Sequence, residues 1–176
     1  GNASGNQIIF SDHSAAESLL YGGSTAQGSA IGNTILFTDS TSFTGGTNMF
    51  GGLAVTGGRA ASNHITFRGN SVATAGSIFG GYTTLDGDAI GNLISILDGA
   101  KVSGTLYGGY AKSTGNASGN QLIFSGNSDT TLPNPGGFGG YSTTGNANGN
   151  TILVTDQART LGFLTGGRAS GNGDAN

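Results

Sequence analysis

Six related copies of one ten-residue string occur along this chain, and this repeat limits the possible folds more than any other feature of the sequence. The string reads GNASGNQIIF from Gly1 and GNASGNQLIF from Gly115. Complete copies begin at residues 1, 28, 58, 87, 115 and 145, and we read a shortened seventh copy from residue 171. A steady period of about 28 residues is typical of solenoids, in which each copy is one structural unit that stacks on its neighbours.

Each copy opens with an alternation of apolar and polar residues that predicts a β-strand. The apolar members share one face of this strand and form the expected core column, which consists of Ile8, Phe10, Ile35, Phe37, Ile65, Phe67, Ile94, Ile96, Leu122, Phe124, Ile152 and Val154. Two residues earlier, on the same face, each copy has an asparagine; these are Asn6, Asn33, Asn63, Asn92, Asn120 and Asn150, with Asn176 in the shortened copy.

No copy can bury its apolar face alone, but copies stacked about 4.8 Å apart would pair strand on strand and bury it. Stacking would also give the asparagines partners, because each side-chain carbonyl can accept a hydrogen bond from the amide of the neighbouring copy. The alternative is that asparagine supplies left-handed backbone at a corner beside glycines such as Gly5 and Gly32. The two interpretations are compatible.

We therefore expect an all-β fold, a parallel β-solenoid of about six coils of roughly 28 residues, with no helices and with residues 1–176 as a single repeat array. The glycine content, 36 of 176 residues, also disfavours helices. At the twelfth position of each copy, Asp or Gly predicts a turn that closes the first strand: Asp12, Asp39, Gly69, Asp98, Gly126 and Asp156.

A second motif, usually an aromatic residue followed by two glycines, lies in the back half of each copy. We expect the apolar residue before the aromatic one to be internal, as at Leu20, Met49, Ile78, Leu106 and Leu164. The first aromatic set would then form a ladder on the surface: Tyr21, Phe50, Phe79, Tyr107 and Phe138. A second set lies three residues further on and should therefore face the opposite way unless the glycines bend the chain: Tyr82, Tyr110 and Tyr141.

The residues that could carry chemistry are few and scattered. Most of the nine acids are at turn positions, and Asp86 and Asp88 could form at most a small acidic spot. His13 and His64 are at different positions of their copies and would not align as metal ligands. We expect no enzyme activity, cofactor or metal; the alternatives are a carbohydrate-active β-helix enzyme and an ice-binding solenoid.

Composition and charge exclude several partners. The six Lys and Arg residues cannot form an electrostatic footprint for nucleic acid, and no apolar run is long enough to insert this segment into a membrane. Apolar residues on the outer face of the first strand, at Ile9, Leu36, Ile123 and Leu153, suggest a seam for lateral bundling.

The strings GNASGN and LYGGYAKSTGNASGN (Leu106 to Asn120) resemble the Gly/Asn-rich repeats in the passenger regions of bacterial autotransporter adhesins. The resemblance implies an extracellular, cell-surface β-helical rod used in adhesion or aggregation, with host or neighbouring-cell molecules as partners. Because the shortened copy after Gly171 would continue into something like Gly1 to Asn6, we also expect self-association end to end or a longer array.

Overall fold

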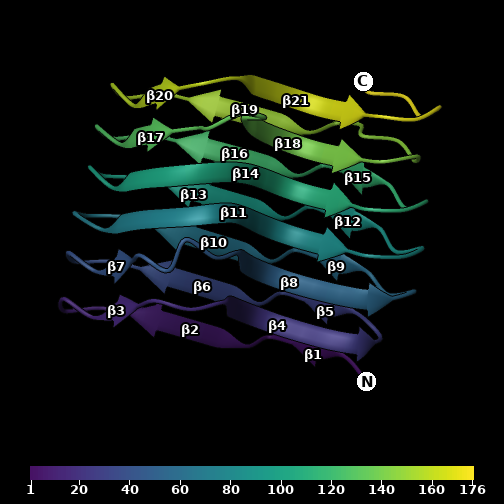
Figure 1. Ribbon diagram of the computed structural model, residues 1–176, viewed down its shortest axis with the longest axis horizontal. Helices are drawn as coiled ribbons and strands as arrows, with labels where there is room; N and C mark the ends of the chain where they lie inside the picture. Colours follow the sequence, from purple (N-terminus) through teal and green to yellow (C-terminus); the bar gives the residue numbers. More distant parts are fainter.

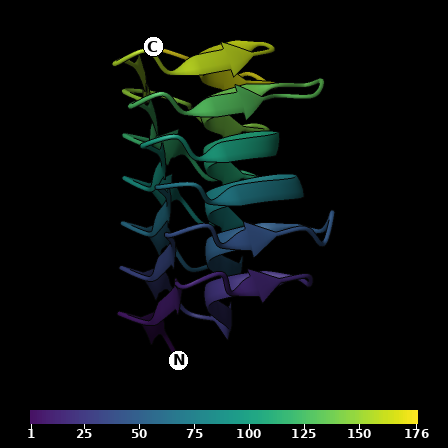
Figure 2. The ribbon, with the colours of Figure 1, turned by 90° about the vertical axis from the view of Figure 1, so that its left-hand side faces the viewer.

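The computed structural model describes all residues, 1–176, and shows a chain wound into stacked coils (Figure 1). It contains 21 β-strands and no helix. Turned by 90°, the coils lie one above another from the N-terminal coil at the bottom to the C-terminal coil at the top (Figure 2). The predicted parallel β-solenoid is confirmed.

The strands form three sheets that run along the stack. The first sheet contains β1 (Ala3–Ser4), β5 (Ala30–Ile31), β9 (Ala60–Ala61), β12 (Ala89–Ile90) and β15 (Ala117–Ser118). The second contains β2 (Gln7–Phe10), β6 (Thr34–Phe37), β10 (His64–Phe67), β13 (Leu93–Ile96), β16 (Gln121–Phe124) and β19 (Thr151–Val154). The third has ten strands: β3 (Ala15–Ala16), β4 (Leu20–Gln27), β7 (Ser42–Phe43), β8 (Met49–Thr56), β11 (Val72–Thr83), β14 (Lys101–Ala111), β17 (Asp129–Thr131), β18 (Gly137–Ser142), β20 (Arg159–Leu161) and β21 (Leu164–Ala169).

Every strand pair is parallel and joins equivalent positions of neighbouring copies. Ile65 of β10, for example, pairs with Ile35 of β6 on one side and with Ile94 of β13 on the other. Copies of unequal length keep this register because their extra residues lie in turns, where an insertion does not disturb the pairing.

The core consists of columns of identical or similar side chains that stack inside the coils. In the four inner coils the predicted core column is fully or almost fully buried, and Met49, Ile78 and Leu106 close the interior from the third sheet. The column is less covered in the outer coils, where Ile8, Phe10 and Ile152 are half-buried. Val154 pairs in register with the buried Phe124 and so continues the predicted core column, although it is 43% exposed at this end of the stack.

The turn after the second sheet has left-handed backbone at the twelfth position of every copy. The φ angles there lie between 52° and 64°, at Asp12, Asp39, Gly69, Asp98, Gly126 and Asp156. Asp and Gly tolerate this conformation better than most residues, which explains their alternation at the position. These aspartates therefore have a local structural role.

The seventh copy begins two residues later than the sequence reading proposed. The amides of Ala147 and Gly149 donate to the carbonyls of Asp174 and Asn176, so Gly173 to Asn176 covers Gly145 to Asn148. A copy starting at Gly171 would leave a single residue for the turn after Ala169, whereas two or three separate the equivalent residue from the next start in every other copy. Asn176 consequently does not continue the column of Asn150.

Candidate functional site

The six asparagines of the first motif form a continuous hydrogen-bonded ladder. In each step the Nδ2 of one asparagine donates to the Oδ1 of the next, over distances of 2.7 to 3.0 Å, through Asn6, Asn33, Asn63, Asn92, Asn120 and Asn150. Asn33, Asn63, Asn92 and Asn120 are fully buried. The ladder is thus the main polar element inside the solenoid.

Each inner asparagine has its whole side-chain amide satisfied. Nδ2 of Asn63 donates to the Ala30 carbonyl and to Oδ1 of Asn92, both at 2.9 Å. Its Oδ1 accepts from the backbone and side-chain amides of Asn33, at 3.1 and 2.8 Å. A buried amide with all its partners avoids the desolvation penalty that an unpaired one would have.

Asparagine does not supply the left-handed corner, which was the alternative interpretation. That conformation belongs to the preceding residue in each copy, with φ between 53° and 67° at Gly5, Gly32, Ser62, Gly91, Gly119 and Gly149. The two residues therefore have separate roles. The residue before the asparagine forms the left-handed corner, and the asparagine side chain forms the hydrogen bonds of the ladder.

The paired glycines of the second motif make room for the ladder. A Cβ at Gly81 would lie 2.3 Å from Nδ2 of Asn92, and one at Gly80 would lie 2.4 Å from the carbonyl oxygen of Gly108 in the next coil. The same two clashes recur along the inner coils. The two sequence motifs are therefore halves of one packing unit, and both glycines are needed because each faces a different obstacle.

A second polar ladder, interrupted at Arg59, runs along the outer corner at the second position of the copies, and the sequence analysis did not predict it. The backbone amide of Ser29 donates to Oδ1 of Asn2 at 2.9 Å, and that of Asn146 donates to Oδ1 of Asn116 at the same distance. Asp88 fills the position in another copy and accepts from the Asn116 amide at 2.8 Å. The signal in the sequence was the recurrence of Asn, Ser or Asp directly after the first glycine in every complete copy except the third, which has Arg59.

The aromatic residues form what we call the aromatic face, on the outside of the third sheet. Its first column contains Tyr21, Phe50, Phe79, Tyr107 and Phe138, and its second column contains Tyr82, Tyr110 and Tyr141. Within each column the rings stack, with centroids 4.9 to 5.2 Å apart. The guanidinium of Arg168 lies 5.5 Å from the centre of the Tyr141 ring, at the upper end.

The two columns do not face opposite ways, and the exception that the sequence analysis allowed, in which the glycine pair bends the chain, is the one observed. Phe79 and Tyr82 meet edge to face, with centroids 4.9 Å apart, so both columns lie on the same side of the sheet. The first column is nevertheless no surface ladder throughout, because Phe50, Phe79 and Phe138 are only 8%, 7% and 2% exposed. The alternation breaks between them because Gly80 and Gly81 both turn toward the interior, as their contacts with Asn92 show. A residue three positions further on therefore returns to the same side.

This packing changes the acidity of two phenols. Burial, reinforced by the neighbouring Tyr110 and Tyr141, raises the pKa of Tyr107 to about 12, although Arg168 acts in the opposite direction. Burial and then Tyr110 raise the pKa of Tyr82 above its usual value. Both side chains are thus held in the neutral form well above neutral pH.

The acids and histidines do not gather into a catalytic or metal-binding arrangement. No group of three or more His, Cys, Asp or Glu residues is placed to hold a metal ion. Asp86 accepts a hydrogen bond from Thr114, at 2.7 Å, and Asp88 belongs to the outer ladder. His13 lies in a turn with a φ of 67°, and His64 projects outward from β10.

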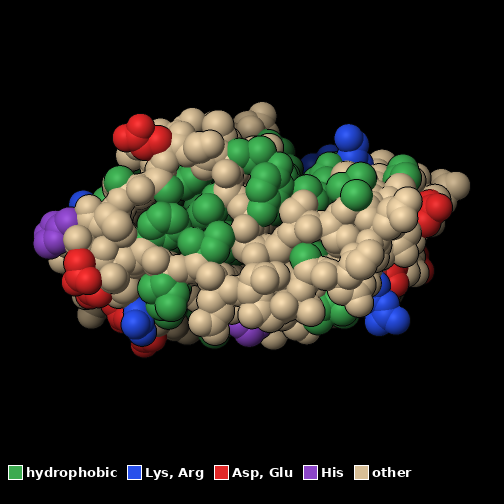
Figure 3. All heavy atoms as spheres, turned by 90° about the horizontal axis from the view of Figure 1, so that it is seen from below, with side chains coloured by type: hydrophobic (Ala, Val, Ile, Leu, Met, Phe, Trp, Pro, Cys, Tyr) green, Lys and Arg blue, Asp and Glu red, His purple; other side chains and the backbone are tan.

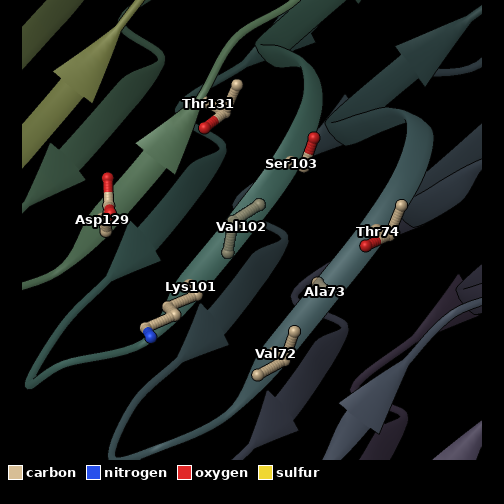
Figure 4. Close-up of a pocket in the computed structure, with 8 residues that line it drawn as sticks. All are labelled: Val72, Ala73, Thr74, Lys101, Val102, Ser103, Asp129 and Thr131. Carbon is tan, nitrogen blue, oxygen red and sulfur yellow. The ribbon is translucent and has the colours of Figure 1, made fainter.

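One hollow is present on the surface, over β11, β14 and β17 (Figure 4). It is lined by Val72, Ala73, Thr74, Lys101, Val102, Ser103, Asp129 and Thr131. Its polar groups are one ammonium, one carboxylate and three hydroxyls, and it lacks the pair of carboxylates that glycoside hydrolysis uses. The hollow is open to solvent, and its lining could contact a small polar group.

The two ends of the stack leave the core columns open. Seen from below, apolar side chains gather in the centre of the N-terminal coil (Figure 3). Phe10, Ala16 and Leu20 pack against the core there while remaining only partly covered. At the other end Val154 is 43% exposed, and Ile152 and Leu164 are only partly covered. These end surfaces present the same columns that the inner coils bury.

The outer face of the second sheet carries the residues proposed as a bundling seam. Ile9 and Leu153 are exposed, and Leu36 and Ile123 are half-buried. Between them, at the same position of their copies, lie Thr66 and Ser95. The seam is therefore a row of outward side chains with a polar interruption at its middle.

The structure has no helix of the length and apolarity that a membrane span requires. Comparison with known proteins finds no matching family model, no similar curated protein and no matching solved structure.

Proposed function

We propose that this chain is a segment of an extracellular rod or stalk, built from stacked solenoid coils, that serves adhesion or aggregation. The proposal includes self-association, with further coils stacking on the ends. It is supported most directly by the two end coils, which repeat the columns of the inner coils and leave them uncovered. Open sheet edges of this kind recruit additional strands.

The ends of the asparagine ladder are complementary. At the N-terminal end, Oδ1 of Asn6 accepts no hydrogen bond from this chain. At the other end, Nδ2 of Asn150 donates only to the Ala117 carbonyl and keeps one hydrogen free. A second copy stacked above would bring its acceptor to this donor and continue the ladder in the same direction.

The apolar columns and the charge also favour stacking. Phe10 covers Phe37 with ring centroids 4.5 Å apart, and a further coil could cover Phe10 in the same manner. The net charge of only −3 leaves little repulsion between copies. Gly173 to Asn176 occupies the place above Gly145 to Asn148 that Gly1 to Ser4 of an incoming copy would take. These four residues of the incoming copy would therefore have to be displaced while it joins through the second and third sheets.

A single substitution can test the stacking without disturbing the fold. Gly166 of β21 is equivalent to Gly80 and Gly139, but its added Cβ would have only an ordinary contact, 3.7 Å from the Asn150 carbonyl. A Cβ at Gly139 would lie 2.4 Å from the Gly166 carbonyl, so Gly166→Ala should obstruct the next coil in the same way. The variant is expected to fold normally, while the added methyl group prevents a further coil from stacking on β21.

The experiment is sedimentation velocity over a range of concentrations, with electron microscopy of the same samples. The unmodified chain should form rods whose length grows with concentration, whereas Gly166→Ala should remain monomeric. Thr165→Ala, an outward change on the same strand, is the matched control and should behave like the unmodified chain. A monomer at every concentration in all three samples would rule out self-stacking.

Adhesion needs its own measurement. Beads coated with the chain should clump more than uncoated beads, and Gly166→Ala should reduce clumping if contacts between rod ends cause it. If clumping persists with Gly166→Ala but disappears when the bundling seam is charged, lateral contacts are responsible. Absence of clumping and of binding to cell surfaces would contradict the adhesive role.

A further inference from the structure

Three tyrosines of the second aromatic column lie in direct contact on successive coils. Tyr82 and Tyr110 stack with ring centroids 5.1 Å apart and planes 4° from parallel. Tyr110 and Tyr141 stack at 4.9 Å and 8°. These residues are 28 and 31 positions apart in the sequence, so only the solenoid brings them together.

The contact is fixed by the backbone. The third sheet pairs Tyr82 with Tyr110 and Tyr110 with Tyr141 in register, and Gly81, Gly109 and Gly140 hold the chain against the asparagine ladder just before each of them. The first aromatic column supports the rings from the side, with Tyr107 meeting Tyr110 edge to face at 5.1 Å. Little side-chain freedom remains to be lost on reaction.

We propose that Tyr82, Tyr110 and Tyr141 form an oxidative cross-linking site, at which dityrosine joins successive coils of the solenoid. The oxidant would be hydrogen peroxide acting through a haem peroxidase or a similar one-electron catalyst. Each of two tyrosines loses one hydrogen atom, and a carbon–carbon bond forms between their ring carbons adjacent to the hydroxyl. The peroxide O–O bond breaks, and its oxygens leave as two molecules of water.

The arrangement assigns the reaction to the second column. Its three members are all tyrosines, are partly exposed and have tyrosine neighbours above or below. In the first column, Tyr21 stacks on Phe50, and Tyr107 stacks between Phe79 and Phe138, which have no phenol to oxidise. Tyr110 is in both stacked pairs and is therefore the essential residue.

A link between adjacent coils would stabilise the solenoid. It would close a loop of about 30 residues and so restrict the unfolded chain, as a disulfide does. By analogy with disulfides in loops of this size, the melting temperature should rise by about 10 °C. The effect does not depend on whether the rod is an adhesin, so the two proposals can fail separately.

The test treats dilute protein with horseradish peroxidase and hydrogen peroxide, then measures dityrosine fluorescence and intact mass. The expected product is a monomer that has lost two hydrogen atoms for each link. Trypsin separates Tyr82, in peptide 69–101, from Tyr107 and Tyr110, in 102–112, and from Tyr141, in 113–159. Linked peptides containing Tyr110 should account for most of the product.

Two conservative variants make the assignment specific. Tyr110→Phe should lose at least about nine-tenths of the intramolecular dityrosine, whereas Tyr107→Phe, in the same cluster, should retain it. Fragmentation of the linked peptides from the unmodified chain distinguishes Tyr107 from Tyr110 even if a variant folds poorly. Links that form only between molecules, links through Tyr107, or equal yields from Tyr110→Phe and the unmodified chain would overturn the proposal.

Discussion

Asn63 and Asn92 are 29 residues apart in the sequence, yet Nδ2 of the first donates to Oδ1 of the second at 2.9 Å. The backbone amide of Asn63 donates to the same oxygen at 3.1 Å. One side-chain oxygen thus satisfies two donors of the neighbouring coil, in a place that water does not reach. Substitutions in the ladder should consequently cost more than the loss of one exposed hydrogen bond.

Asn92→Ala should lower the free energy of unfolding by about 3 to 5 kcal/mol, because it leaves two buried donors of Asn63 without an acceptor. Asn6→Ala, in the first coil, removes one donor and should cost less than about 1 kcal/mol. Urea unfolding followed by circular dichroism measures both. Equal effects would mean that the ladder contributes no more inside than at the end.

Gly80→Ala should destabilise the fold by about 3 kcal/mol, because its Cβ would lie 2.4 Å from the Gly108 carbonyl oxygen and would force the coils apart. Gly166→Ala is the matched change in the last coil and should alter the free energy of unfolding of the monomer by less than about 0.5 kcal/mol. Unfolding at low concentration measures the difference. Similar losses in both variants would show that propensity, not space, explains the glycine.

Charging the bundling seam should separate laterally associated rods without unfolding them. In the triple variant L36K/I123K/L153K, each new ammonium projects from the outer face of the second sheet, where like charges repel. Electron microscopy should show single rods in place of bundles, while the β-sheet circular dichroism persists. Loss of that signal would instead place the three residues among those that hold the coils together.

Stability should decline at alkaline pH as tyrosines of the unfolded chain ionise. The unfolded chain releases its phenol protons near pH 10, whereas the folded chain holds that of Tyr107 until its pKa of about 12. The folded state therefore binds more protons between these values, and the free energy of unfolding falls as the pH rises through them. Below pH 10 the contribution is complete and constant.

Urea unfolding at a series of pH values, for the unmodified chain and for Tyr107→Phe, measures this effect. Tyr107→Phe removes the titrating group while preserving the ring, so its alkaline loss of stability should be smaller. If the two curves are parallel, Tyr107 titrates alike in the folded and unfolded chains.

The repeat was sufficient to predict the solenoid because every copy has to bury the same face. Ile65 and Phe67 recur at equivalent positions in the copies on either side, and no arrangement other than stacking buries them all. The glycine pair was harder to interpret. Period-two alternation assumes a regular strand, and only the position of Asn92 reveals that Gly80 and Gly81 both face inward.

The turn at the twelfth position of each copy could be predicted from its Asp or Gly, but the length of the turn before the last copy could not. The dipeptide Gly171-Asn172 resembles the start of a copy. The turn nevertheless extends for two more residues, and the stacking on the previous copy begins at Gly173. Local sequence similarity cannot distinguish these starts, because turn length is set by the distance that the backbone must cover. The outer ladder was missed for a related reason, since its side chains differ from copy to copy.

The in-register columns have a consequence for how such a gene can change in length. Because each coil contacts only the coils above and below, and these contacts recur at equivalent positions, duplicating or deleting one whole copy reproduces contacts that already exist. Unequal recombination between copies can therefore lengthen or shorten the protein in steps of one coil while the fold persists. An insertion or deletion of one residue within β10 or β13 has no such freedom, since it would turn the core column outward.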